Sequence, residues 1–353
     1  MEEKIAAAVS GGIDSLVAAH LLKESGKRVV GVHFLTGYEN PGTGPDDVRK
    51  AAARVGIEVE IADVRDAFKK NVVDYFVRTY QGGETPNPCM VCNAAIKFGA
   101  ALFFARKLGA DRLATGHYAG IERDESGALH IVKGQDPQKD QSYFLAFLGR
   151  DQIASACFPL AGMTKTEVRE LAAKKGIEPV SKKESQDVCF IQGQSYARFL
   201  ESLPGFVPRP GIIQDMQGRT LGRHGGLHLF TVGQRKGINC PAPAPYYVAE
   251  LDPFKNRVRV GSRDDLLSDR RRVKDIVWAA GTPGGPFRAS VKLRYRHDPV
   301  PATVYPKGAD QAEAAFDRPQ TAAPGQGAVF YDGNCLLGGG RLEKPPGRDR
   351  GRC

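Results

Sequence analysis

The first half of the chain alternates short apolar runs with longer segments whose apolar residues recur every three or four positions. Apolar runs that predict buried strands occupy residues 4–9, 28–34, 58–64 and 111–118. Amphipathic segments that predict helices occupy residues 14–26, 46–56, 97–110 and 164–176. In the last of these, Thr164 and Glu167 have the spacing of a capping box. This order predicts an α/β fold with a doubly wound parallel sheet, whose sites lie at the carboxyl ends of the strands.

The hydrophobic pattern changes near residue 205. Short strand-like runs now alternate with glycine and proline turns, and no long amphipathic segment follows. We therefore predict a catalytic domain at 1–204, a small β-rich central module at 205–272 and a C-terminal β-barrel at 273–345. Residues 346–353 read as a disordered basic tail.

Composition adds that the chain is an ordinary soluble protein with a basic surface. Its 353 residues are 41% hydrophobic and 25% charged, with a formal net charge of +10. There is no run of about 18 apolar residues, and the acidic N-terminus does not resemble a signal peptide, so we expect a cytoplasmic protein without a membrane span. Seven cysteines without a framework spacing predict reduced thiols.

The basic residues gather in a few places, at 270–275, at 291–297 and in the tail. A solvated surface would account for them. The arginine-rich stretch that contains Tyr295 also suits phosphate contacts combined with stacking on bases, which favours an RNA partner.

The sequence AVSGGIDS at residues 8–15 carries the first chemical signal. An apolar run leads directly into Ser10, Gly11 and Gly12, and a helix is expected to begin near Asp14. Backbone N–H groups and a helix N-terminus in this arrangement bind anions. The stretch lacks the ending of a Walker A loop and the GxGxxG spacing of a dinucleotide site. It resembles the pyrophosphate loop of the N-type ATP pyrophosphatases, which implies that it binds the pyrophosphate of ATP and its Mg²⁺.

A second motif, ATGHYA at residues 114–119, ends a predicted strand and should lie at the same edge of the sheet. Gly116 would let a nucleotide approach closely. His117 could contact phosphate or could be structural, and its pairing with the SGGIDS loop favours the functional interpretation.

The cysteines supply the third signal. Cys89 and Cys92 form a CxxC pair within ETPNPCMVCN, and Cys189 lies far along the chain in ESQDVCFI. A structural zinc site would want two close ligand pairs, and no second CxxC is present. A thioredoxin-type dithiol normally opens a helix after a strand, whereas prolines precede this pair. The remaining cysteines are interpreted as core or surface fillers: Cys157, Cys240, Cys335 and Cys353.

Taken together, these motifs resemble one family. AVSGGIDS, TPNPCMVCN, IKF, ATGHYA, KDQSYFL, SQDVCFI, FTVGQRKG and LRYRH occur in this order, and the resemblance covers residues 4 to about 342. It is to the tRNA-specific 2-thiouridylase family (MnmA/TrmU), whose members place sulfur on C2 of the wobble uridine of certain tRNAs. The resemblance implies ATP and Mg²⁺ as cofactors, tRNA as substrate, and a cysteine desulfurase or relay protein as sulfur donor. We expect a monomer.

The resemblance also implies residue roles. Cys92 matches the nucleophile and Cys189 the cysteine that carries the persulfide, and Asp14 acts in the ATP loop. The implied nucleotide contacts are Ala8, Val9, Ser10, Gly11, Gly12, Ile13, Asp14, Ser15, Phe34 and Gly116. The implied tRNA contacts are Asn87, Pro88, Cys89, Lys139, Asp140, Gln141, Arg294 and Tyr295, with Arg235 and Lys236 as phosphate contacts in the central module.

Residue chemistry is consistent with this assignment. Replacing a carbonyl oxygen by sulfur needs a leaving group, which adenylation provides, and a nucleophilic sulfur, which a persulfide provides. A second thiol must then release that sulfur and leave a disulfide. Cys92 and Cys189 must therefore come within disulfide reach, with Cα atoms under about 7 Å apart.

Two departures from the family pattern keep alternatives open. Many members have aspartate where this chain has Cys89, so Cys89, Cys92 and Cys189 could instead hold a 4Fe-4S cluster that delivers the sulfur. Phe34 stands where many members have methionine, and the segment that follows it is unusual. Two other functions also remain open, an amide-forming ATP pyrophosphatase acting on a small substrate and a non-catalytic RNA-binding protein.

Overall fold

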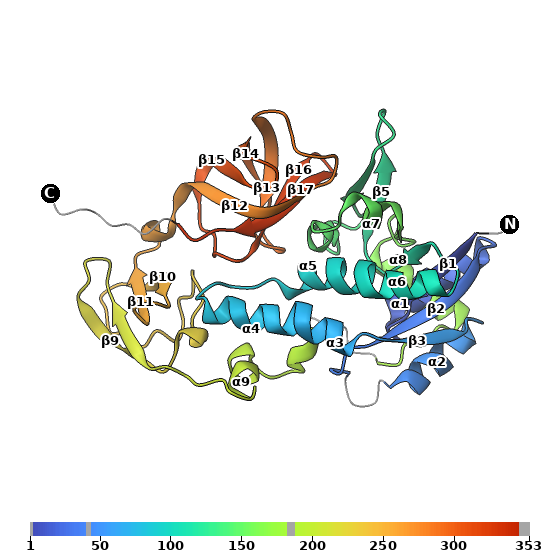
Figure 1. Ribbon diagram of the computed structural model, residues 1–353, viewed down its shortest axis with the longest axis horizontal. Helices are drawn as coiled ribbons and strands as arrows, with labels where there is room; N and C mark the ends of the chain where they lie inside the picture. Colours follow the sequence, from blue (N-terminus) through green and yellow to red (C-terminus); the bar gives the residue numbers. More distant parts are fainter. Residues whose placement is uncertain (1–2, 40–43, 182–187, 346–353) are drawn as a thin grey trace.

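The structure is a computed structural model that describes residues 3–39, 44–181 and 188–345. Within these residues the chain forms three sheets of five, four and eight strands, arranged along an elongated molecule (Figure 1). The predicted fold class is confirmed. The domain boundaries remain predictions, and the predicted basic tail lies outside the described residues.

The N-terminal sheet is entirely parallel, with strand order β3-β2-β1-β4-β7. Its strands are β1 (Lys4–Ala8), β2 (Arg28–Leu35), β3 (Val59–Asp63), β4 (Arg112–Ala114) and β7 (Ala156–Cys157). Apolar runs form these strands because helices cover both faces of the sheet. The strand order reverses between β1 and β4, and ligands of such sheets bind at the carboxyl ends of the strands at this switch point.

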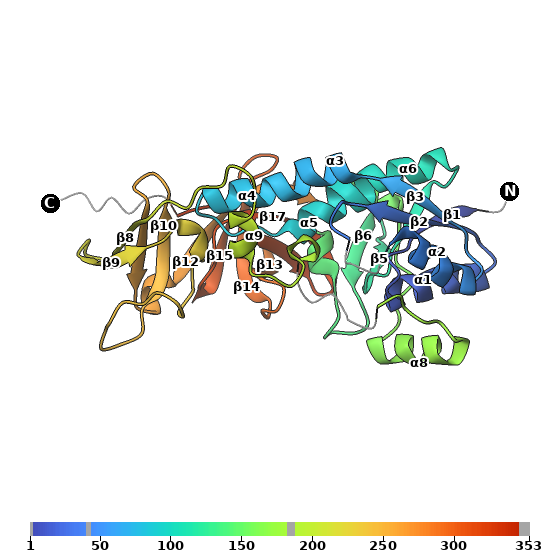
Figure 2. The same ribbon diagram turned by 90° about the horizontal axis from the view of Figure 1, so that it is seen from below.

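Three helices cover one face of this sheet: α1 (Ile13–Glu24), α2 (Pro45–Arg54) and α8 (Lys165–Lys175). Figure 2 shows α8 at the edge of the molecule, below α1. The predicted capping box is present, since Glu167 N–H donates to Thr164 Oγ1 at 3.3 Å and Thr164 N–H donates to the Glu167 carboxylate at 2.6 Å. Gly176 ends α8 at a φ of +65°.

Two long helical rods cover the other face and run side by side (Figures 1 and 2). The first comprises α3 (Arg65–Phe68), η1 (Lys69–Val73) and α4 (Asp74–Gln81). The second comprises α5 (Pro88–Cys92), η2 (Asn93–Ala101) and α6 (Leu102–Lys107). The middle segments η1 and η2 are π-helical, with wider turns than an α-helix. The sequence predicted only the end of the second rod, from residue 97, and did not predict the first.

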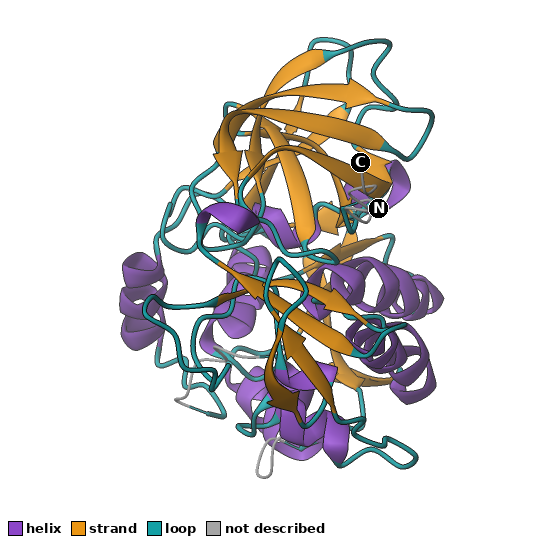
Figure 3. Ribbon diagram, turned by 90° about the vertical axis from the view of Figure 1, so that its left-hand side faces the viewer, coloured by secondary structure: helices purple, strands orange, loops and turns teal. Residues whose placement is uncertain are grey.

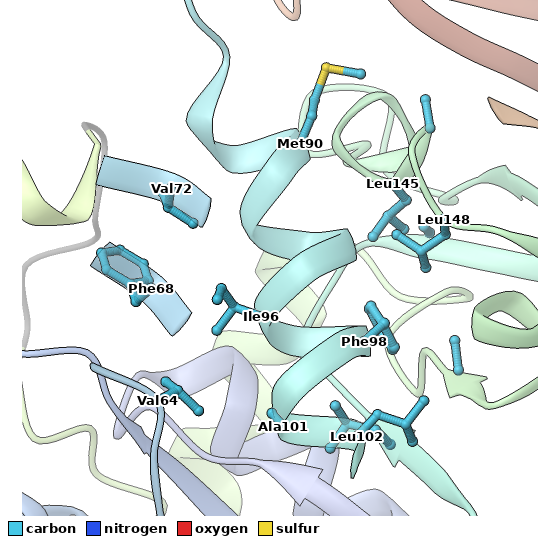
Figure 4. Close-up of a cluster of buried hydrophobic side chains, with 14 of the residues drawn as sticks. Val64, Phe68, Val72, Met90, Ile96, Phe98, Ala101, Leu102, Leu145 and Leu148 are labelled. Atoms are coloured by element: carbon cyan, nitrogen blue, oxygen red, sulfur yellow. The ribbon is translucent and has the colours of Figure 1, made fainter. Parts of the chain in front are cut away.

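The second rod is also the one described helix that is long and apolar enough to cross a membrane, by length and composition alone. Figure 4 shows why this is weak support for a membrane span. Apolar side chains such as Ile96, Phe98 and Leu102 lie among those of Phe68 and Leu145 in one buried cluster. Burial in the protein core thus accounts for this composition.

The central sheet has the order β10-β11-β8-β9. Its strands are β8 (Gly211–Gln214), β9 (Thr220–His224), β10 (Tyr247–Asp252) and β11 (Arg257–Gly261). A small core that includes Ile213, Val248 and Val258 holds it together. Shorter helical elements in and around it are α9 (Tyr196–Glu201), η5 (Leu227–Leu229) and η6 (Asp264–Leu266). As predicted, no long helix follows residue 205 in the described part of the chain.

The C-terminal strands close into a barrel because β12 pairs with both β15 and β17 (Figure 3). The barrel strands are β12 (Ser268–Trp278), β13 (Phe287–Lys292), β14 (Val300–Pro306), β15 (Ala312–Gln320), β16 (Gly327–Asp332) and β17 (Cys335–Leu342). β12 begins before the predicted boundary at residue 273. A hairpin from the N-terminal half, β5 (Ala119–Arg123) and β6 (Leu129–Lys133), extends the barrel sheet through the pairing of Val132 with Cys335.

Candidate active site: a nucleotide loop and a thiol recess

The SGGIDS loop lies between β1 and α1 and holds its own shape. Ser15 Oγ donates to the Gly12 carbonyl at 2.8 Å and accepts from the Ser10 N–H at 3.2 Å. Gly11 has a φ of +79°, and a Cβ there would lie 2.8 Å from Val180 Cγ2, so only glycine fits. The loop thus presents backbone N–H groups at the N-terminus of α1, where an anion would bind.

Asp14, the one charged residue of the loop, is held by two side chains that the sequence did not single out. Lys165 Nζ lies 2.7 Å from each carboxylate oxygen of Asp14, and the Tyr118 hydroxyl donates to Oδ1 at 2.7 Å. The Lys165 side chain is 7% exposed, whereas that of Asp14 is 33% exposed. Tyr118 lies within the quoted ATGHYA motif, and Lys165 begins the predicted helix at 164–176, but neither motif indicated this contact.

Gly116 brings the two nucleotide motifs together at the switch point of the sheet. A Cβ at Gly116 would lie 2.8 Å from the carbonyl carbon of Asp14 and 2.9 Å from the N of Ser15. Glycine is therefore required here because the backbone of α1 passes close to Gly116. The sequence analysis predicted a different reason, the close approach of a nucleotide. A nucleotide contact at Gly116 remains a prediction.

His117 is held by protein contacts in this arrangement. It is buried, with Nδ1 at 2.7 Å from Thr115 Oγ1 and Nε2 at 3.3 Å from Lys97 Nζ. Burial lowers the pKa of His117 well below its ordinary value, so the ring is neutral and can accept from the Lys97 ammonium. Both ring nitrogens contact protein atoms, which favours the structural interpretation over a phosphate contact.

Phe34 lies at the carboxyl end of β2, beside β1, and is half-buried. This is the edge of the sheet at which a nucleotide would bind. Contact with adenine remains a prediction. Part of the unusual segment after Phe34 lies outside the described residues.

The CxxC pair opens the second helical rod. Asn87 caps α5 by accepting from the Met90 N–H at 3.4 Å, and Pro88 occupies the first turn, where its missing N–H has no cost. Cys89 and Cys92 therefore lie on the first turns of a helix. The pair thus opens a helix, as in a thioredoxin-type dithiol, but residues 84–87 directly before it form no strand.

All three thiols of interest are free, and we call the partly desolvated region around them the thiol recess. Cys89 and Cys189 are exposed and Cys92 is partly buried. Removal from bulk water nevertheless raises the pKa of Cys89 to about 11 and that of Cys92 to about 12, and also raises the pKa of Cys189. The charge of Cys189 contributes to the raised pKa of both other thiols, so the three groups lie near one another.

Lys97 places a positive charge in this recess, and the sequence analysis assigned no role to it. Its charge lowers the pKa of Cys89, Cys92 and Cys189, against the effect of burial. Lys97 lies five residues after Cys92 in the π-helical segment η2. Because π-helical turns close between residues five apart, Lys97 lies about one turn from Cys92. The buried His117 accepts from its ammonium and fixes its position.

The thiols do not form a metal site among the described residues, where no three His, Cys, Asp or Glu side chains are placed to hold a metal ion. A 4Fe-4S cluster held by Cys89, Cys92 and Cys189 remains a prediction. The separation of Cys92 and Cys189 within disulfide reach remains a prediction. Cys189 begins η4 (Cys189–Ile191), and the motif residues at 185–187 lie outside the described part of the chain.

Some of the predicted tRNA contacts, those at 87–89 and Tyr295, lie around the start of the second rod. Tyr295 packs on Phe144 with ring centroids 4.4 Å apart, and Phe144 O accepts from buried Asn93, next to Cys92, at 2.9 Å. A Cβ on Gly233 of the central module would lie 3.3 Å from an Arg294 guanidinium nitrogen. The loop after β13, the turn η3 (Ser142–Leu145) and the CxxC helix therefore come together, and their contact with tRNA remains a prediction.

The loop at Lys139, Asp140 and Gln141 is held mainly by internal contacts. The buried Asp140 carboxylate accepts from the Gly134 N–H at 3.2 Å and from the Ser142 N–H at 3.1 Å. Gln141 exchanges hydrogen bonds with the backbone of Tyr118. Asp140 and Gln141 thus shape the loop, and direct tRNA contacts by these residues remain predictions. Arg235 and Lys236 are exposed in the central module.

The barrel positions the segment that leads into the CxxC pair, which sequence reasoning missed. Gln326 Nε2 donates to the carbonyls of Thr85 at 3.1 Å and Pro86 at 3.0 Å. Gly325, with a φ of +86°, allows this approach, since a Cβ there would lie 2.8 Å from Thr85 O. A fixed CxxC segment therefore depends on the C-terminal domain.

Comparison with known proteins agrees with this division of the chain. Residues 3–193 match the family model described as the tRNA methyl transferase HUP domain, and residues 198–262 match its PRC-barrel domain. Residues 268–342 match the aminomethyltransferase beta-barrel domain. A curated relative from Desulfosudis oleivorans, named tRNA-specific 2-thiouridylase MnmA, is 55% identical over 95% of this chain and 94% of its own length. The chain belongs to the tRNA-specific 2-thiouridylase (MnmA) family.

Other members of the MnmA family match over as much of the chain. The relative of the same name from Geotalea uraniireducens is 43% identical over 97% of this chain and 95% of its own length. Among solved structures, the U34-tRNA thiolase NcsA from Methanococcus maripaludis, with its 4Fe-4S cluster, matches with a TM-score of 0.35 and 22% identity. That match covers 54% of this chain and 61% of the other, and it is too distant to carry an argument about the site.

Proposed function

We propose that this chain is an ATP-dependent tRNA 2-thiouridylase that replaces the C2 oxygen of the wobble uridine with sulfur and releases AMP and pyrophosphate. One observation carries the proposal. A preformed anion loop at the switch point of the parallel sheet occurs in the same domain as a recess that holds Cys89, Cys92 and Cys189. Family membership gives this combination its substrate class.

The nucleotide side of the reaction uses the SGGIDS loop. ATP, with Mg²⁺, supplies the adenylate that turns the uridine C2 oxygen into a leaving group. The N–H groups at Gly11, Gly12 and the start of α1 are suited to the pyrophosphate oxygens, and the Asp14 carboxylate is the oxygen ligand that Mg²⁺ prefers. Their task is to hold the phosphates in line with the uridine oxygen.

The sulfur side uses two thiols in sequence. A donor protein, a cysteine desulfurase or relay, leaves a persulfide on Cys189, and its terminal sulfur attacks C2 as AMP departs. The Cys92 thiolate then attacks Cys189 Sγ, which breaks the persulfide bond, leaves the sulfur on C2 and forms a Cys92–Cys189 disulfide. A dithiol reductant restores both thiols.

Lys97 supports this sequence electrostatically. Burial favours the neutral thiols in the resting protein, since it raises the pKa of Cys92 to about 12. A reacting thiolate or persulfide anion needs a nearby cation, and the Lys97 ammonium, held against neutral His117, provides it.

The substrate side fits RNA. Exposed Arg235 and Lys236, together with Arg294 and Tyr295 in the barrel, would contact phosphates and bases of a tRNA whose target uridine is turned out toward Cys89. A formal net charge of +10 supports binding to a polyanion. We expect a soluble cytoplasmic monomer.

Thiolation is favoured over the other functions that the sequence left open. The family models are described in terms of methyl transfer, whereas the curated relatives are named for thiolation, and thiolation is the chemistry that needs the recess of thiols. A small-substrate amide synthetase would have no use for that recess or for the barrel that positions it.

Reconstitution tests the proposal. Purified protein is incubated with unmodified tRNA, ATP, Mg²⁺, and a cysteine desulfurase with cysteine, and 2-thiouridine is measured by mass spectrometry of nucleosides. Cys189→Ala and Cys92→Ala should abolish product, whereas Cys335→Ala, which changes a thiol at the start of β17 in the barrel, should not. Absence of 2-thiouridine with the wild-type protein would refute the proposal.

Iron content separates the persulfide route from the cluster route. Protein purified without oxygen should be colourless, free of iron and fully active. Stoichiometric iron with absorption near about 400 nm, lost together with activity, would replace the persulfide route by the cluster route.

A further inference from the structure

The loop at residues 36–39 follows β2 directly, so it begins at the edge of the sheet where a nucleotide would bind. It belongs to the segment after Phe34 that departs from the family pattern. The Glu39 carboxylate fixes its shape, because Oε1 accepts from the Thr36 N–H at 2.5 Å and from the Gly37 N–H at 3.1 Å. Gly37 permits this turn with a φ of +82°. The loop is therefore an ordered extension of β2.

Tyr38 joins this loop to the residue next to Cys189. The centroid of its ring lies 5.9 Å from that of Phe190 in an edge-to-face arrangement, 5.8 Å from that of Phe68 and 6.3 Å from that of Phe199. Phe190 is 2% exposed, whereas the neighbouring Cys189 is exposed. Phe190 is thus a buried anchor directly beside the exposed thiol, and Tyr38 is one of the rings that hold this anchor.

A second contact joins the loop to the same segment at the surface. Gln192 Nε2 donates to the Glu39 carbonyl at 3.2 Å, and Gln192 ends η4 in a left-handed turn with a φ of +52°. Removal from bulk water raises the pKa of Cys189, and the negative charge of Glu39 adds to this effect, so Glu39 also lies near the thiol. The loop therefore contacts the Cys189 segment both in the core and at the surface.

The placement of Cys189 matters because its sulfur must meet one carbon atom of the uridine. A displacement of about 1 Å in a group that positions reactants can reduce the rate by about 100-fold. The loop at residues 36–39 ties Cys189 to the end of β2, which belongs to the edge of the sheet where adenylation is expected. The same strand would thus set the positions of the nucleotide and of the sulfur.

We propose that the loop at residues 36–39 positions Cys189 for sulfur transfer, with Tyr38 holding Phe190 and the Glu39 carbonyl holding Gln192. This inference rests on the proposed function and deepens it. Tyr38 is a positioning residue, since it acts through Phe190 and not on the reacting atoms.

Hydrogen–deuterium exchange tests the placement of Cys189 without turnover. The peptide that contains residues 188–192 is followed by mass spectrometry, and its Ile191 N–H, which donates to the Val188 carbonyl at 3.0 Å, reports whether the segment stays folded. Tyr38→Leu should speed exchange in this peptide at least about tenfold, because edge-to-face contacts with the anchor are lost. Tyr38→Phe keeps the ring and should stay within about twofold of the wild type.

Tyr196→Leu is the matched control. Tyr196 lies on the neighbouring helix α9 and stacks on Tyr80 with ring centroids 4.8 Å apart. The control therefore removes an aromatic contact from the same part of the molecule but not the contact between Tyr38 and Phe190. Exchange at residues 188–192 should stay within about twofold of the wild type.

Sulfur transfer and adenylation are then measured separately in single turnovers. Protein loaded with a persulfide on Cys189 by a cysteine desulfurase and cysteine is mixed with tRNA, ATP and Mg²⁺, and 2-thiouridine and pyrophosphate are followed in the same samples. Tyr38→Leu should slow 2-thiouridine formation about 10- to 100-fold and leave pyrophosphate release within about twofold. Tyr38→Phe and Tyr196→Leu should leave both rates within about twofold. A merely destabilising substitution would lower both rates together.

Gln192→Ala tests the surface contact with little risk to folding, because Gln192 is exposed. Loss of its hydrogen bond to the Glu39 carbonyl should slow 2-thiouridine formation about 3- to 10-fold and leave pyrophosphate release unchanged. Gln194→Ala, at an exposed position two residues later, should change neither rate.

Each outcome supports or overturns the inference. Unchanged exchange at residues 188–192 in Tyr38→Leu would overturn it, as would an equal loss of both rates. If Tyr38→Leu does not fold, Gln192→Ala decides alone, and 2-thiouridine formation no slower than in Gln194→Ala would overturn the inference. Absence of 2-thiouridine with the wild type would instead overturn the proposed function, and the role of the loop in sulfur transfer with it.

Discussion

Substitution of Gly116 by alanine is expected to disturb the nucleotide loop through one added methyl group. Gly116 is not among the residues with a left-handed backbone, so alanine is tolerated by its φ and the effect comes from space alone. The Cβ would lie 2.8 Å from the Asp14 carbonyl carbon, 2.9 Å from Ser15 N and 3.0 Å from Asp14 O. All three are backbone atoms, which cannot turn away as a side chain can.

The magnitude follows from this geometry. Ordinary contacts begin at 3.4 Å, so the start of α1 or the loop at 115–118 must move by about 0.5–1 Å. Overpacking of this kind costs about 1–3 kcal/mol of the free energy of unfolding. A displacement near 1 Å in a group that positions a substrate can reduce the rate by about 100-fold. We therefore expect kcat/KM for tRNA-dependent pyrophosphate release to fall by about 10- to 100-fold.

The assay combines urea denaturation with pyrophosphate release, and Gly162→Ala is the matched control. Gly162 is exposed in the same domain, and a Cβ there would meet only Gln135 Oε1 at 3.8 Å. The control should stay within about 0.5 kcal/mol of the wild type, with unchanged activity. If Gly116→Ala behaved like Gly162→Ala, the packing of the two motifs against each other would be refuted.

Three further changes have defined outcomes. Burial lowers the pKa of His117, so below about pH 6.5 the unfolded chain binds more protons at this residue than the folded chain does. The free energy of unfolding should therefore fall on acidification by up to about 1.4 kcal/mol per pH unit. Urea titrations of His117→Gln should lack this dependence on pH, and an unchanged dependence would contradict the burial of a neutral His117. Lys97→Met removes the cation that lowers the pKa of Cys92, so alkylation of Cys92 by iodoacetamide at pH 9 should slow, whereas Lys107→Met at the far end of the rod should have no effect. Gly327→Ala places a Cβ 2.5 Å from Met90 Sδ and should lower the free energy of unfolding, measured by urea denaturation, by about 1–3 kcal/mol. In the control Gly284→Ala the new Cβ meets nothing within 4 Å. A loss no larger than that of the control would show that Gly327 does not pack tightly against Met90.

The parallel sheet could be predicted because its signals are local. Each strand is a short apolar run, and α1, α2 and α8 show helical spacing and clear ends, including the capping box at Thr164. The first rod could not be predicted from a period of 3.6 residues, because the wider turns of η1 interrupt that spacing. The hairpin of β5 and β6 joins the barrel through a pairing between Val132 and Cys335, which no local pattern records.

The candidate site also has a part that could be predicted from local sequence and a part that could not. The motifs located the loop and the cysteines, because glycine, serine and thiol groups in such patterns have few other uses. Tyr118, Lys165 and Lys97 matter only because folding brings them to Asp14 and to the thiols, from positions up to 151 residues away in the chain. An ordinary lysine on a helix has no sequence signature of that role.

The central claim is that this chain inserts sulfur into tRNA, and the nucleosides of tRNA from the source organism test it most directly. Deletion of the gene should remove 2-thiouridine derivatives at the wobble position, as measured by mass spectrometry of total tRNA. The wild-type gene should restore them, and the Cys189→Ala variant, produced at the same level, should not. Unchanged 2-thiouridine content in the deletion strain, or full restoration by Cys189→Ala, would contradict the account.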